Sequence, residues 1–129
     1  ILSVGILRLF VHAHVNNIKA NDLDHAVFET TSIIEEFKAQ NKNLMSRLSK
    51  EKISFSLYYD KNWQTIEQKE NAEYAIFAEV YPIENSYGLY AVELRCEKLR
   101  GYPLENKQKE IYKASSVFEA LEEWGNYHD

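Results

Sequence analysis

The sequence predicts an α+β domain in which one long N-terminal helix packs on a small antiparallel β-sheet. Three observations lead to this prediction. The first residues are apolar on nearly every side, a helical period then continues to about Asn41, and from Ile53 onward the period changes to two. The chain has 129 residues, of which 45% are hydrophobic and 13% aromatic, so it can bury a core of its own as a single domain, 1–129.

The first element, residues 1–15, reads ILSVGILRLFVHAHV and is apolar nearly all round up to Val11. A helix with no polar face is buried in protein or in membrane. The run is shorter than the ~20 residues that cross a bilayer, and it lacks the basic region and cleavage site of a signal peptide. Because the chain begins with Ile, we expect a processed, trimmed or partial chain, and we interpret residues 1–15 as a truncated apolar anchor.

Residues 16–41 continue the helix as an amphipathic segment with a period near 3.6. No Gly or Pro interrupts the chain between Gly5 and Pro82. A helix from about Leu2 to about Asn41 would be ~60 Å long, which exceeds the width of a domain of this size, so its N-terminal end should project. We expect any bend at Thr30–Thr31. The residues expected to face the sheet are Val15, Ile18, Leu23, Val27, Ile34 and Phe37.

The sheet is expected within residues 53–129. Apolar and polar residues alternate in three runs, which predict strands at 53–59, 75–81 and 89–97. Turn residues at 85–88 join the last two as a hairpin. Residues 111–118 fit a fourth strand or the start of a final helix, and 118–124 has a helical composition. The nine tyrosines are interpreted as sheet packing, with an interaction surface as the alternative.

The composition argues against several kinds of site. A net charge of −5 disfavours a nucleic-acid binder, which usually carries a basic face. Cys96, in an alternating run with no nearby His, is interpreted as a buried apolar residue. His12 and His14 are two apart and do not share a helix face, and His14 and His25 are three turns apart. Asp22 and Asp24 lack the rest of a calcium-loop pattern, so we expect no metal and no cofactor.

The first six residues, Ile1-Leu2-Ser3-Val4-Gly5-Ile6, resemble the middle of the N-terminal helix of type IV pilin-like proteins, closest to the minor pilins and the minor pseudopilins of type II secretion. In that family a leader peptide is cut before a phenylalanine. The exposed helix anchors the protein in the inner membrane and then packs in the core of a filament, while an antiparallel sheet lies against its second half. The family's cleavage motif would precede Ile1.

The resemblance implies a structural or assembly subunit of a type IV pilus or a type II secretion pseudopilus, with no enzymatic activity. Its partners would be other pilin-like subunits, and its location the inner membrane, with an extracytoplasmic domain and a possible place in a surface filament. Arg8 departs from a purely apolar anchor and should lie near the membrane interface or face a partner. The implied membrane and filament-core residues are Ile1, Leu2, Val4, Gly5, Ile6, Leu7, Leu9, Phe10 and Val11.

Two other functions compete with this one. The chain could be a soluble binding or immunity-type module whose N-terminal helix packs on its own sheet or in a dimer. It could also be a small enzyme that acts through carboxylates such as Asp60 or Glu79, although no spacing in the sequence supports such a site.

Overall fold

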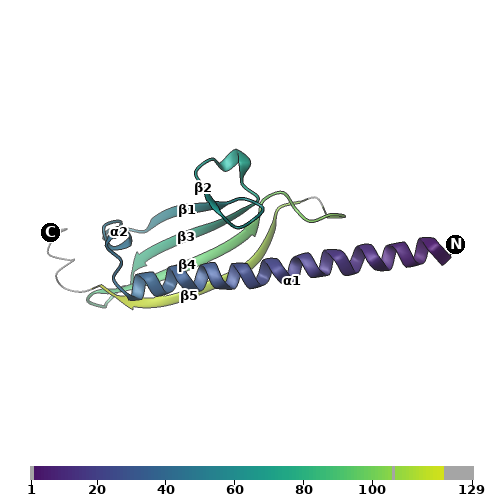
Figure 1. Cartoon of the computed structure of the whole chain (residues 1–129). Helices are drawn as coiled ribbons and strands as arrows, with labels where there is room; N and C mark the ends of the chain where they lie inside the picture. Colours follow the sequence, from purple (N-terminus) through teal and green to yellow (C-terminus); the bar gives the residue numbers. More distant parts are fainter. Residues whose placement is uncertain (1, 106, 121–129) are drawn as a thin grey trace.

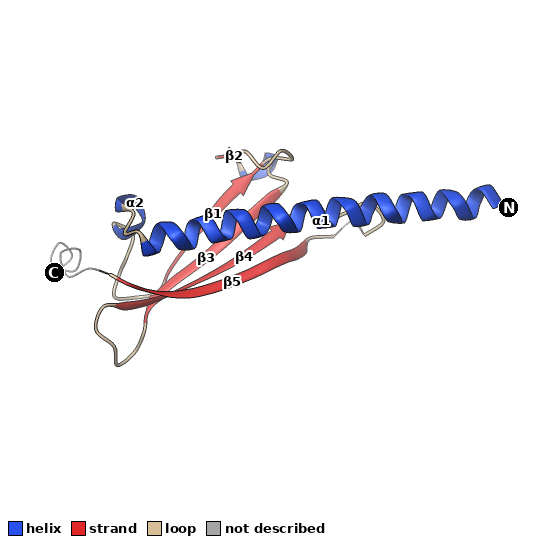
Figure 2. Ribbon diagram, turned by 60° about the horizontal axis from the view of Figure 1, so that its bottom comes forward, coloured by secondary structure: helices blue, strands red, loops and turns tan. Residues whose placement is uncertain are grey.

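One long helix lies across one face of a five-stranded antiparallel sheet (Figures 1 and 2). The computed structural model describes residues 2–105 and 107–120, and within the helix it describes side chains from Ala13 onward. The predicted α+β class and the long N-terminal helix are confirmed.

The helix α1 spans Leu2–Lys38, which at 1.5 Å per residue is about 55 Å. It continues through Thr30–Thr31, so the expected weak point does not interrupt it. The hydroxyl of Thr30 donates back to the carbonyl of Ala26 at 2.8 Å, which satisfies this buried polar group within the helix.

The helix ends at Lys38, where the chain turns. Gln40 adopts a left-handed backbone with φ of 61°, which no α-helix can continue. Asn41 then caps the short helix α2, Lys42–Met45, because its side-chain oxygen accepts from the backbone N–H of Asn43 at 3.0 Å. The expected break at residues 41–43 is therefore a cap between two helices.

Five strands form the sheet, in the spatial order β2-β1-β3-β4-β5. The three expected strands and the hairpin are confirmed, and residues 111–118 lie in a strand rather than a helix. The expected loop or short helix at 64–71 holds both β2 and a turn of 3₁₀-helix at Lys69–Asn71. The bounds are β1 Ile53–Tyr59, β2 Thr65–Ile66, β3 Tyr74–Pro82, β4 Leu89–Lys98 and β5 Lys109–Glu119.

The end of β5 has a structure different from the one that its composition predicts. Phe118 and Glu119 close β5, although this stretch has the composition of a helix. The pairing of Tyr90 with Phe118 and of Leu89 with Glu119 supplies the backbone hydrogen bonds that a helix would otherwise make. The rest of the expected helix, residues 121–124, lies outside the described residues.

The core forms between α1 and the inner face of the sheet. Alternate residues of the central strands point inward and are fully buried, among them Ile76, Val80, Val92 and Cys96. The helix contributes Ala26, Ile33 and Phe37, and α2 covers the end with Met45.

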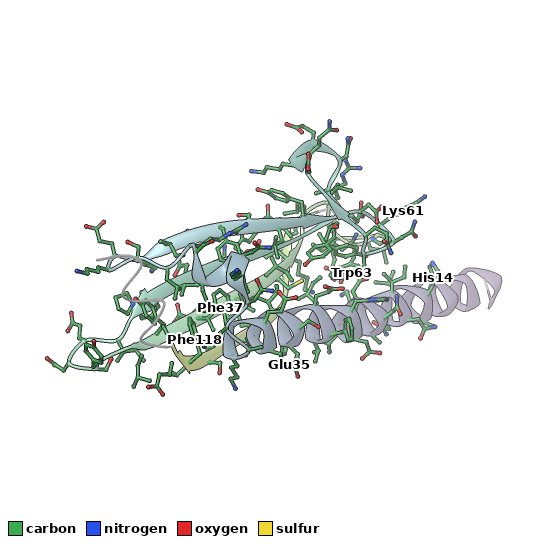
Figure 3. The ribbon with its side chains drawn as sticks, turned by 60° about the vertical axis from the view of Figure 1, so that its left-hand side comes forward. His14, Glu35, Phe37, Lys61, Trp63 and Phe118 are labelled. Atoms are coloured by element: carbon green, nitrogen blue, oxygen red, sulfur yellow. The ribbon has the colours of Figure 1, made fainter. Side chains whose placement is uncertain are left out.

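Phe37 is the aromatic centre of that end of the core. Its ring stacks on Phe118 of β5 at 4.9 Å between centroids and meets Phe55 of β1 at 6.5 Å. Figure 3 shows Phe37 and Phe118 side by side where α1 meets the sheet. One helix residue thus links β1 and β5, which lie on either side of the central strands β3 and β4.

We predict that Phe37→Ala lowers the free energy of unfolding by about 3–5 kcal/mol, because it removes a fully buried ring from between two strands. The measurement is urea unfolding followed by circular dichroism. Phe28→Ala is the matched control, since Phe28 is 65% exposed on the same helix. Equal losses in the two variants would contradict the packing described here.

Candidate functional site

The candidate site is α1 itself, because this helix is longer than the sheet that it covers. Figure 1 shows its N-terminal part extending beyond the strands, while its C-terminal part crosses the sheet. Ala13 and His14 are exposed, and Val15 is the first buried side chain among those that the structure describes in this helix. The segment before Val15 is about 20 Å long.

The proposed membrane and filament-core residues lie in this projecting segment. Leu2, Val4, Gly5, Ile6, Leu7, Leu9, Phe10 and Val11 all belong to α1, and the surroundings of their side chains are outside the description, as is Ile1. Among the described residues, no helix is both long and apolar enough to span a bilayer.

The face that α1 turns to the sheet differs from the predicted one. Two predicted contacts are wrong, because Leu23 is 42% and Val27 37% exposed. Val15 and Phe37 are buried as predicted, while Ile18 and Ile34 are half-buried at the margin. The buried positions follow one another at intervals of three, four or seven, as a helical stripe should: Val15, Asp22, Ala26, Thr30, Ile33 and Phe37.

Polar residues caused this error. Asp22 and Thr30 occupy the centre of the buried stripe, and neither was among the apolar residues through which the predicted face was drawn. A stripe drawn through apolar residues alone is therefore rotated toward Leu23 and Val27. One signal in the sequence pointed to the correct face. Asp22, Ala26 and Thr30 are each four residues apart, so they share a helix face, and Ala26 is small enough to lie close against a sheet.

Asp22 lies at the point where the helix meets the sheet, with 2% of its surface exposed. It accepts two hydrogen bonds, one from the hydroxyl of Tyr74 at 2.7 Å and one from the hydroxyl of Tyr102 at 2.8 Å. Tyr74 begins β3, and Tyr102 lies in the loop between β4 and β5. Both oxygens of the buried carboxylate therefore have a partner, which offsets the cost of taking it out of water.

Two ion pairs extend this contact, and together with Asp22, Tyr74 and Tyr102 we call them the Asp22 cluster. Lys19 of α1 pairs with Glu105 of the β4–β5 loop at 2.5 Å. Lys98, only 5% exposed, pairs with Glu73 and lies over the rings of Tyr74 and Tyr102, 5.0 and 5.3 Å from their centroids. The buried ammonium group is thus compensated by a carboxylate and two aromatic faces.

The cluster raises the pKa of its tyrosines. Burial raises the pKa of both Tyr74 and Tyr102 far above the ordinary value of 10.0, and the hydrogen bond to the Asp22 carboxylate raises it further. Burial also raises the pKa of Tyr59. These phenols therefore stay protonated at any physiological pH, and Tyr74 and Tyr102 keep donating to Asp22.

The residues considered for catalysis have structural roles. The carboxylate of Asp60 accepts from the backbone N–H of Asn62 at 2.8 Å and of Gln64 at 3.0 Å, so it holds a turn. Glu79 forms a surface ion pair with Lys52 at 2.8 Å. Burial raises the pKa of the Cys96 thiol to about 12, which keeps it in the unreactive protonated form.

The described residues hold no cluster of three His, Cys, Asp or Glu side chains that could bind a metal ion. His14 and Asp24 are exposed, whereas Asp22, the other acid considered for calcium, is committed to the two tyrosines.

A hollow of about 500 Å³ lies on the opposite, open face of the sheet. Two cross-strand rows form it, one through Ser54, Glu79, Glu93 and Ser115 and one through Ser56, Phe77, Arg95 and Lys113. Its charged groups are partnered, since Glu79 pairs with Lys52, Arg95 with Glu97, and Glu93 accepts from Tyr81. This surface resembles the solvated face of an ordinary antiparallel sheet.

Comparison with known proteins gave no match: no family of proteins, no curated protein and no solved structure is significantly similar to this chain.

We predict that Tyr102→Phe lowers the free energy of unfolding by about 2 kcal/mol, because it leaves one oxygen of the buried Asp22 carboxylate without its donor. Urea unfolding gives the value. Tyr90→Phe is the control, since the Tyr90 hydroxyl makes no hydrogen bond with any described residue, and it should cost much less. A Tyr102→Phe variant as stable as the parent would show that this hydrogen bond contributes nothing.

We also predict that the fold weakens in alkali. The folded-state pKa values of Tyr59, Tyr74 and Tyr102 are raised above 10.0, so their contribution is complete below pH 10 and is lost as the pH rises beyond it. Urea midpoints measured from about pH 8 to about pH 12 should fall, and the part of the tyrosinate absorbance that comes from these three buried phenols should appear only together with unfolding. Full tyrosine ionisation in a still-folded protein would contradict this.

Proposed function

We propose that this chain is an assembly subunit of a type IV pilus or a type II secretion pseudopilus. It would place the apolar part of α1 first in the inner membrane and then in the core of a filament, beside the helices of other pilin-like subunits. Its role would be structural, without enzymatic activity or a cofactor, and the sheet domain would lie on the extracytoplasmic side.

One observation carries the proposal. The helix α1 is continuous from Leu2 to Lys38, and Figure 1 shows its N-terminal part extending beyond the strands. Among its described side chains, which start at Ala13, the first buried one is Val15. The segment before Val15 is also the most apolar part of the chain. Apolar surface that its own domain leaves uncovered gains stability by entering a membrane or packing against another protein.

The Asp22 cluster supports the same role. It fixes α1 to the β4–β5 loop and to the start of β3, close to the point where the helix leaves the sheet. A helix that carries load from a filament core to a surface domain needs such an attachment at the exit point. The hydrophobic contacts farther along, around Phe37, then hold the C-terminal part of the helix against the sheet.

A soluble binding module remains the competing proposal, and the hollow on the open face of the sheet is the observation in its favour. The two proposals differ in what they require of the projecting helix. A filament subunit needs its apolar surface for membrane insertion, whereas a soluble module must keep that surface covered in water by itself or by a second copy.

We predict that the full chain partitions with membranes and that Leu9→Glu releases it. A carboxylate at the centre of an apolar segment costs about 3 kcal/mol in a bilayer. The readout is the fraction of protein that sediments with membranes after expression in a Gram-negative host. Lys38→Glu, at the other end of α1, is the control and should remain membrane-bound.

Deleting residues 1–13 gives a second readout, because it removes the part of α1 that precedes Val15, the first buried residue among the described side chains of the helix. The shortened protein should be soluble and unfold cooperatively. The genomic sequence before Ile1 should encode a short basic leader and a cleavage site before Phe-Thr-Leu-x-Glu. A full chain that is monodisperse without detergent, or a soluble domain encoded upstream, would refute the filament proposal.

A further inference from the structure

A second hollow lies between α1 and the loop that joins β1 to β2. It measures about 390 Å³. The helix lines it with Asp24, His25, Phe28 and Glu29, and the loop lines it with Asn62, Trp63 and Gln64. Figure 3 shows Trp63 between the loop and α1. We call this hollow the Trp63 pocket.

The pocket is acidic and its polar groups are unused. The side chains of Asp24, Glu29, Asn62 and Gln64 make no hydrogen bond or ion pair with any described residue, and none of the lining residues is Lys or Arg. Burial raises the pKa of Glu29, so its carboxylate is poorly solvated where it stands. A cation entering the pocket would meet two carboxylates, with the imidazole of His25 as the one basic side chain among the lining residues.

Trp63 forms the inner wall and is itself unusual. Its indole lies between the ring of His25, 5.3 Å away, and the ring of Tyr74, 3.9 Å away, so both of its faces are covered. It is 93% buried, and its Nε1–H has no hydrogen-bond partner among the described residues. The residue also adopts a left-handed backbone with φ of 61°, which is costly for a bulky side chain.

These features describe a site that is incomplete on its own. An unpaired buried N–H and a strained backbone both cost stability and persist where they serve a purpose. A ligand that brought an acceptor oxygen to the Nε1–H would give it the partner that no described residue supplies. Phe28, 65% exposed at the rim, offers a free aromatic face next to Asp24, one helical turn away.

We propose that the Trp63 pocket binds an arginine side chain of a partner protein. The guanidinium would pair with Asp24 and Glu29 and stack on Phe28, and a backbone carbonyl beside the arginine would accept from Trp63 Nε1. Arginine suits the site because its planar group pairs with carboxylates and stacks on an aromatic ring at once. The proposal is independent of the filament role, since it uses none of the residues of α1 before Val15.

The test titrates the ¹⁵N-labelled full chain, in a non-ionic detergent, with the capped tripeptide Gly-Arg-Gly. The probe is the NMR signal of the Trp63 indole N–H, assigned with a Trp124→Phe variant. We expect a saturable shift of this signal that weakens with added salt. The same peptide with citrulline in place of arginine has nearly the same shape without the charge, and it should give little shift.

The Asp24→Asn/Glu29→Gln double variant should raise the Kd for the arginine peptide about five-fold. This factor corresponds to the loss of two exposed ion pairs that contribute about 0.5 kcal/mol each. The matched control, Glu35→Gln/Glu51→Gln, removes the same charge from exposed positions outside the pocket and should bind like the parent. Absence of a saturable shift, equal shifts with citrulline, or equal weakening in both double variants would overturn the proposal.

Discussion

The attachment of α1 to the sheet is the constraint on which the rest of this structure depends. The helix would be marginal in water as a free segment, and it is stabilised by the stripe that it buries. That stripe contains a carboxylate at its centre. Asp22 can lie there only because Tyr74 and Tyr102 donate to both of its oxygens. Strand β3, the β4–β5 loop and the helix are therefore fixed relative to one another by one buried acid.

A directional contact of this kind sets geometry in a way that apolar packing does not. Apolar side chains tolerate small rotations of a helix on a sheet, whereas two hydrogen bonds below 3 Å tolerate little. The rotation fixed by Asp22 has consequences on both flanks of α1. It exposes Leu23 and Val27 on one flank and places Asp24, Phe28 and Glu29 beside Trp63 on the other.

The two proposals therefore divide the helix between them. The part before Val15 would serve assembly in membrane and filament, and the part that crosses the sheet would both hold the domain and present a pocket for a basic partner. Polar groups with internal partners, such as those of the Asp22 cluster, stabilise the fold. Polar groups that lack them, such as those of the Trp63 pocket, mark where a partner would bind.

The sequence by itself determined the class of fold, the position of the long helix and three of the strands, because these follow from local periodicity in hydrophobicity. It also indicated that α1 is longer than its domain is wide, because this prediction requires only the length of an uninterrupted helical pattern. Only the tertiary structure decided the face of the helix, the strand at 109–119 and the Trp63 pocket. The physical reason is that a buried Asp, a strand paired through its backbone and a pocket between distant segments depend on partners far away in the chain, which no local pattern reveals.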